Sequence, residues 1–167
     1  MAGTRFPKNV CGLLVLTACA QSVYYFPLLP GRVASHFAGS GAPNGWMSKQ
    51  GFFAVYAGLI VVAACMVFGM PYWIAHMSAA RVNLPNKEYW FSPAHRAETI
   101  GFFEKFFAWY GSALLLFEIF VIELALQANL SAIPRLPAGR IVMLVSCFAF
   151  FNIVWILRLL RRFSNRE

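Results

Sequence analysis

The chain has 167 residues, of which 60% are hydrophobic and only 12% are charged. Soluble domains carry about 25% charged and 45–50% apolar residues, so this composition, with a mean hydropathy of +0.62, excludes an ordinary soluble domain. The net charge of +8 could indicate a nucleic-acid-binding protein, but the basic residues flank long apolar segments. We therefore expect a lipid bilayer around the chain and no nucleic-acid partner.

Four apolar segments predict transmembrane helices, at residues 9–29, 52–76, 102–126 and 139–160. Each is near the roughly 20 residues that cross a bilayer, and a backbone in lipid must satisfy its own hydrogen bonds. The first segment contains an Ala18-Cys19-Ala20 site typical of cleaved signals, but its apolar run continues past that site. We expect an uncleaved first helix and an all-α, polytopic integral membrane four-helix bundle forming a single domain over residues 1–167.

Lys and Arg residues lie unequally on the two sides of these predicted helices. One side holds Arg5, Lys8, Arg81, Lys87, Arg96, Lys105, Arg158, Arg161, Arg162 and Arg166, and the other holds Arg32, Lys49, Arg135 and Arg140. The positive-inside rule then predicts that the N and C termini and the loop 77–101 are cytoplasmic. The basic C-terminal tail RLLRRFSNR is expected to contact anionic lipid headgroups.

The loop over residues 28–51 joins the first two predicted helices on the outer side and is rich in Gly and Pro. Its Asn44-Gly45 pair predicts a tight turn, because both residues tolerate positive φ. We expect this loop to pack against the helix ends.

Three further local signals lie in the second helix and the loop after it. Ala54 and Gly58 have the spacing of a close helix–helix contact. Pro71 predicts a kink, because it removes one backbone hydrogen bond. Ser92-Pro93 is a favourable helix start and predicts that the third helix begins there.

Residues 25–49, YFPLLPGRVASHFAGSGAPNGWMSK, resemble the signature of a bacterial membrane domain of unassigned function. That domain forms the N-terminal half of SdpI-type immunity proteins and also occurs alone in small four-helix proteins. The matching residues are Pro27, Leu29, Pro30, His36, Phe37, Gly41, Pro43, Gly45, Trp46 and Lys49, with Asn44 where the family usually has Asp. The resemblance implies a multi-pass protein of the bacterial cytoplasmic (inner) membrane, with no catalytic residues and no cofactor.

His36 is the most prominent single residue of this signature loop. It could contact a ligand or a metal, since histidine suits both. Alternatively it is a hydrogen-bonded organiser that pins the loop to the helix ends, as buried polar groups usually find such partners. We favour the organiser.

His76, His95 and Glu98 form a predicted polar cluster on the cytoplasmic side. Two histidines and one carboxylate could ligate a metal. No HExxH-like motif accompanies them, so we favour a set of interfacial polar groups that contact arginines and lipid phosphates, and we expect no metal.

Glu118 lies within the third predicted span, where an ionisable residue is costly and is by default a functional candidate. Asn152 and Gln21 are its expected partners. Such a hydrogen bond would hold helices together, which we favour over a proton relay because a single acid without further relay groups is weak support for proton transfer.

The rest of the chain carries no catalytic signature. Glu123, nearer the outer side, is predicted to pair with Arg135 or Arg140. A nucleophile elbow, a P-loop and Rossmann glycines are all absent from the sequence.

We therefore expect a non-enzymatic membrane interaction protein that resembles the SdpI-type immunity domain and binds another membrane protein or peptide. The alternative is an accessory subunit of a larger membrane complex, respiratory or photosynthetic. A third possibility is a small membrane enzyme or transporter that uses His36 or Glu118.

Overall fold

The structure is a computed structural model that describes residues 2–164, with side chains described from Thr4 onward. Its long helices are α1 (Ala2–Leu28), α2 (Lys49–Ala64), α5 (Arg96–Leu130) and α6 (Ala138–Ser164). Within the described residues, four helical segments are long and apolar enough to cross a bilayer, with α2 and its continuation to His76 forming the second. The prediction of four helices long and apolar enough to span a membrane is confirmed.

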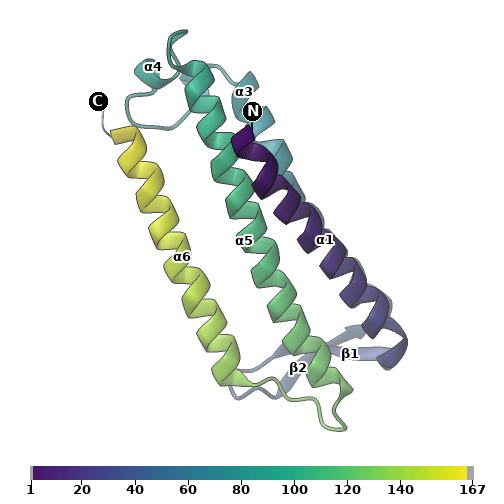
Figure 1. The fold of residues 1–167 in the computed structure, drawn as a ribbon. Helices are drawn as coiled ribbons and strands as arrows, with labels where there is room; N and C mark the ends of the chain where they lie inside the picture. The colour runs from purple at the N-terminus through teal and green to yellow at the C-terminus, as the bar shows by residue number, and fades with distance from the viewer. Residues whose placement is uncertain (1, 165–167) are drawn as a thin grey trace.

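The start of α1 and the end of α6 lie at one end of the bundle, which we call the termini end (Figure 1). The short helices α3 (Met70–His76) and α4 (Lys87–Trp90) lie at the same end. A small sheet closes the opposite end, the hairpin end. Which end faces the cytoplasm remains a prediction from the charge distribution, and Arg166 of the predicted basic tail lies outside the described residues.

The sheet corrects the prediction of an all-helical fold. Strands β1 (Arg32–Phe37) and β2 (Pro43–Ser48) form an antiparallel pair in which Val33 lies opposite Met47 and Ala34 opposite Trp46. The turn between the strands is closed by a 2.8 Å hydrogen bond from the Ala38 amide to the Ala42 carbonyl. The Asn44-Gly45 turn prediction is therefore wrong, because both residues lie inside β2.

The second span is not a uniform α-helix. A π-helical turn, η1 (Cys65–Gly69), separates α2 from α3, and the Met70 amide bonds to the carbonyl of Cys65, five residues earlier. Pro71 follows directly and has no N–H to donate. The irregularity expected at this proline thus takes the form of a single π-helical turn, a rare variant that occurs mostly as one widened turn within an α-helix.

Helix α5 begins later than the sequence predicted. The carbonyl of Ser92 accepts hydrogen bonds from the amides of His95 (3.1 Å) and Arg96 (2.9 Å). These bonds close a separate turn after α4, and regular helix starts at Arg96. The expected helix start at Ser92-Pro93 is therefore wrong by one turn.

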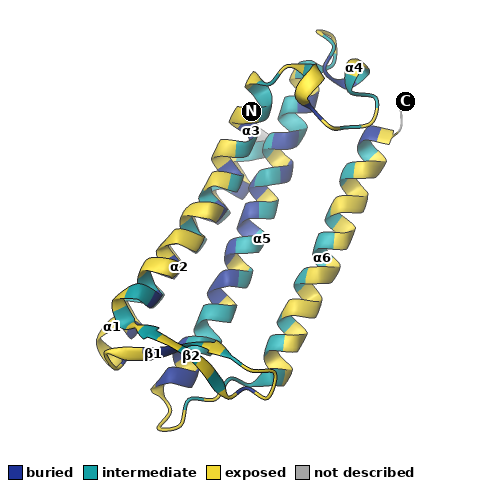
Figure 2. Cartoon of the chain, turned by 180° about the vertical axis from the view of Figure 1, so that it is seen from behind, coloured by how far each residue is buried: buried dark blue, intermediate teal, exposed yellow. Residues whose placement is uncertain are grey.

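Helix α5 is the centre of the bundle and packs on α1, α2 and η1. In the apolar part of α5, 39% of the residues are buried, whereas the apolar part of α6 contains no buried residue. Figure 2 shows this contrast as dark blue along α5 and mainly yellow and teal along α6. Helix α6 is thus an outlying helix with most of its surface available to lipid.

Helix α5 approaches the second span closely at Gly111. A Cβ there would lie 2.9 Å from the Ala63 carbonyl oxygen and would overlap the Val67 side chain. Within the described residues, no helix uses the close contact that Ala54 and Gly58 would allow: both residues are exposed, and no atom lies within 4 Å of a Cβ at Gly58. Small residues permit a close contact but do not select which face of a helix makes it.

Candidate functional site: the anchored hairpin

The hairpin has one face in the protein core and one face outside. Val33 belongs to a buried cluster with Phe52 and Leu126, and Met47 packs against this cluster. Directly paired residues share a face of a sheet and successive residues alternate. Trp46 and its partner Ala34 are therefore on the opposite face, where Trp46 is 45% exposed although Ala34 is buried.

Asn129, near the end of α5, holds the hairpin to the bundle. Its Oδ1 accepts a hydrogen bond from the Ala34 amide (2.7 Å), and its Nδ2 donates to the Ala34 carbonyl (2.9 Å). Nδ2 also donates to the carbonyl of Ala125 in its own helix (2.9 Å). Both Asn129 and Ala34 are buried, so this contact satisfies backbone groups that water cannot reach.

Lys49 anchors the other side of the hairpin, where β2 leads into α2. Its Nζ donates to the Leu29 carbonyl (3.0 Å) and lies 4.7 Å from the centre of the Phe26 ring. Its backbone amide donates to the Gly31 carbonyl (2.9 Å). The preceding Ser48 caps α2 by accepting a hydrogen bond from the amide two residues after Lys49 (3.1 Å).

The turn of the hairpin also contacts the segment between α5 and α6. Gly41 has a φ of +82°, which favours glycine. A Cβ at this position would collide with the Leu136 carbonyl oxygen. The amide of Leu136 donates to the Gly41 carbonyl (2.9 Å), and Arg135 donates to the Ser40 carbonyl (3.4 Å).

His36 is exposed on the hairpin and makes only local contacts in the described part of the chain. Its Nδ1 lies 3.1 Å from the Ser35 hydroxyl. Gly45 lies opposite, and a Cβ there would be 2.9 Å from the His36 Cβ. The anchoring that the sequence assigned to His36 is provided by Asn129 and Lys49.

The remaining signature residues shape the ends of the hairpin. Pro30 lies just before β1, and Phe37 pairs with Pro43 at the far end of the ladder. Asn44 is exposed.

A hydrogen-bonded network of polar side chains joins α1, α2 and α5. The Glu123 carboxylate accepts from Tyr25 (2.5 Å), Gln21 (2.7 Å) and Gln127 (2.7 Å). The Tyr56 hydroxyl in turn donates to Oε1 of Gln21 (2.6 Å). Glu123 therefore has partners other than the predicted arginines, and the network links three helices.

Glu118 is buried one helical turn before this network. Its Oε2 has no hydrogen-bond partner among the described residues. Gln21 bonds to Glu123 instead, and the predicted partner Asn152 accepts from Tyr110 (2.8 Å) and donates to a carbonyl of its own helix (2.7 Å). The expected pairings of Glu118 are therefore not present.

The three residues of the predicted polar cluster at the termini end have separate partners. His76 bonds to the Tyr72 carbonyl through Nδ1 (2.7 Å), and His95 stacks on Tyr89 with ring centres 4.2 Å apart. Glu98 pairs with an arginine of α6. Residues 4–164 contain no group of three side chains placed to hold a metal ion.

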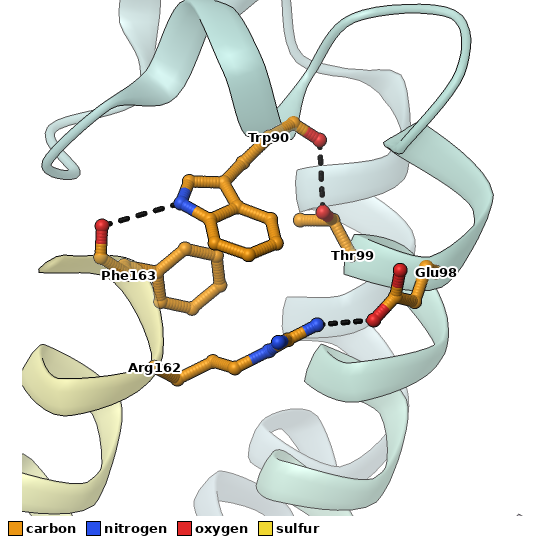
Figure 3. A network of polar contacts seen from close by, with 5 residues as sticks. All are labelled: Trp90, Glu98, Thr99, Arg162 and Phe163. Carbon is orange, nitrogen blue, oxygen red and sulfur yellow. Dashed lines mark hydrogen bonds and ion pairs between the residues drawn. The ribbon is translucent and has the colours of Figure 1, made fainter. Parts of the chain in front are cut away.

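That arginine belongs to a contact that fastens the end of α6 (Figure 3). Arg162 pairs with Glu98, and the Trp90 indole donates to the Phe163 carbonyl (3.2 Å). Thr99 in turn donates to the Trp90 carbonyl (2.8 Å). The Phe163 side chain is fully buried, so α6 is fixed at the termini end although the rest of the helix is largely exposed.

Sequence reasoning did not find Asn129 or Phe163. The only signal for Asn129 was a polar side chain near the end of an apolar run, which is also typical of a residue at the membrane surface. Phe163 is one of 17 phenylalanines, and nothing in its neighbourhood distinguishes it from those that face lipid.

Comparison with known protein families places the hairpin in a defined domain. Residues 13–61 match a family described as a domain of unknown function (DUF1648). The match contains the hairpin and Lys49 but neither Asn129 nor the α6 contact. No curated protein and no solved structure matches the chain. The resemblance to SdpI-type immunity proteins stays a prediction.

Proposed function

We propose that this chain is a non-enzymatic membrane protein whose hairpin binds another membrane protein or a peptide. The observation that carries the proposal is the difference between the two faces of the hairpin. Its inner face and backbone are anchored by Asn129 and Lys49, while Trp46 and Arg32 remain exposed on the other face. Tryptophan and arginine are the residue types that most often dominate binding energy at interfaces.

The rigidity of the hairpin supports a binding role. Asn129, Lys49 and Gly41 attach it to α5, to the end of α1 and to the segment after α5. A surface that is already ordered loses little conformational entropy when a partner binds. The hairpin is therefore suited to present Trp46 in a constant position.

The surroundings of His36 favour binding over catalysis. A nucleophile or general base needs a positioned partner that activates or orients it. The Ser35 hydroxyl lies 3.1 Å from His36, but no third group among the described residues forms a hydrogen bond that would orient the imidazole, and His36 is exposed. Glu118, the other candidate, is buried in α5, and its Oε2 has no hydrogen-bond partner among the described residues that could relay a proton.

The test is purification from the native membrane in mild detergent, followed by mass spectrometry of the proteins and peptides that accompany the chain. We expect a partner that is lost with Trp46→Ala and retained with Trp73→Ala, a matched control that is 59% exposed near the termini end. Retention of every partner by Trp46→Ala would contradict the proposal.

A second candidate function is favoured by α6. This helix exposes large apolar side chains on most of its length, including Phe150 (69%) and Ile153 (58%). An accessory subunit of a larger membrane complex would have such a surface covered by neighbouring helices. Loss of a stoichiometric set of subunits with Phe150→Ala, but not with Trp46→Ala, would favour this role over the first.

A further inference from the structure

An apolar cavity of about 320 Å³ lies between α1, α5 and α6. Its walls come from Val10 and Leu14 of α1, Ala113 and Leu116 of α5, and Phe151 of α6. Apolar cavities do not hold ordered water. In a bilayer, the natural occupant of such a space open to the membrane is a hydrocarbon chain.

A second cavity of about 170 Å³ continues from the first toward the termini end. The two share Trp109, Trp155 and Arg158, and the second adds Lys105. The apolar space is thus bounded at one end by two cations, one from α5 and one from α6. Both cationic residues are exposed.

These two cations are not neutralised within the described part of the chain. The salt bridge found there joins Arg162 to Glu98, and Arg158 lies 5.5 Å from the Trp155 ring. Glu104, the residue before Lys105, lines a different cavity nearer the termini end, which it shares with Glu98 and Lys105. It does not line either cavity that contains Arg158 and Trp109.

We propose that this groove binds one anionic phospholipid, with an acyl chain between α1, α5 and α6 and the headgroup phosphate between Lys105 and Arg158. Charge complementarity selects the occupant, because two cations next to an apolar slot match a molecule with an anionic head and a hydrocarbon tail. Basic pockets between transmembrane helices are established sites for anionic lipid headgroups. The site is separate from the hairpin, and it includes Arg158, the first residue of the predicted basic tail.

The experiment is native mass spectrometry of the purified full chain in detergent, titrated with phosphatidylglycerol or with phosphatidylcholine of the same acyl chains. We expect one phosphatidylglycerol to bind about tenfold or more tightly than phosphatidylcholine, as two interfacial cations predict. The double variant Lys105→Gln/Arg158→Gln should lose this preference. Arg161→Gln, a matched exposed cation of α6 that lines neither cavity, should keep it.

A second variant tests the acyl slot. Ala113→Trp fills the apolar cavity and should weaken binding of phosphatidylglycerol about tenfold, whereas Ala57→Trp on the exposed surface of α2 should not. Circular dichroism and thermal unfolding of each variant show that the fold is retained. Equal binding of the two lipids, a preference that survives the double variant, or displacement of the lipid by inorganic phosphate would overturn the proposal.

Discussion

The side-chain amide of Asn129 forms hydrogen bonds with both the amide and the carbonyl of Ala34, a strand residue 95 positions earlier in the chain. It occupies the place that a neighbouring strand would take beside β1. The membrane helix α5 therefore sets the position of the hairpin directly, through one buried side chain.

Replacing Asn129 by Ala should release the hairpin. The change leaves the buried amide and carbonyl of Ala34 without partners, which costs about 1–3 kcal/mol. We expect faster hydrogen exchange over residues 32–48 and a lower free energy of unfolding in detergent titration. Asn152→Ala, a matched change on α6, should leave exchange in the hairpin unaltered.

Gly41→Ala should destabilise the turn of the hairpin. Gly41 has a φ of +82°, and a Cβ would collide with the Leu136 carbonyl. A non-glycine residue in this backbone region costs about 1–3 kcal/mol. Thermal unfolding should show this loss for Gly41→Ala but not for Gly39→Ala, where no atom lies within 4 Å of the added Cβ. Equal unfolding temperatures for the two variants would contradict the expectation.

Tyr56→Phe should weaken the network between α1, α2 and α5. It removes the 2.6 Å hydrogen bond to Gln21 while it keeps the ring that is buried beside α5. We expect a loss of about 1 kcal/mol in the free energy of unfolding. Tyr24→Phe is the control, because the Tyr24 side chain is 64% exposed; a loss of similar size in both variants would show that the network does not hold the helices.

Phe163→Ala should detach the end of α6 from the bundle. Phe163 is fully buried between Trp90 and the rings of Phe102 and Phe103. Removal of a buried phenylalanine ring typically costs about 3–5 kcal/mol. Hydrogen exchange should increase over the last two turns of α6, while Phe150→Ala, an exposed position on the same helix, should leave it unchanged. An unaltered exchange pattern in Phe163→Ala would mean that the other contacts at this end hold α6 to the bundle without Phe163.

The hydrophobic segments of the sequence predicted the four spans well, because a helix that crosses about 30 Å of hydrocarbon needs a long run of consecutive apolar residues. The hairpin was not foreseen. Its strands RVASHF and PNGWMS show no clear alternation of apolar and polar residues, and the strongest turn signal, Asn44-Gly45, lies inside β2. Gly45 is needed there for space next to His36 rather than for a turn.

The sequence did not predict which polar side chains of different spans form hydrogen bonds with each other. Polar residues within lipid are expected to find partners, and this holds for Gln21, Glu123 and Asn152. Which partner each finds depends on the rotation and depth of every helix. Glu123 bonds to Tyr25 instead of an arginine, because α1 packs along α5.

By itself, the sequence determined that the chain is a membrane protein with four spans and that a Gly- and Pro-rich segment with a recognisable signature joins the first two. Composition and segment length suffice for this, since they reflect the solvent around the chain. Only the tertiary structure decided that the segment is a hairpin held by Asn129, that α6 is fastened at one end by Phe163, and that Lys105 and Arg158 meet beside an apolar groove. Those features join residues distant in the chain, so they depend on how the helices pack.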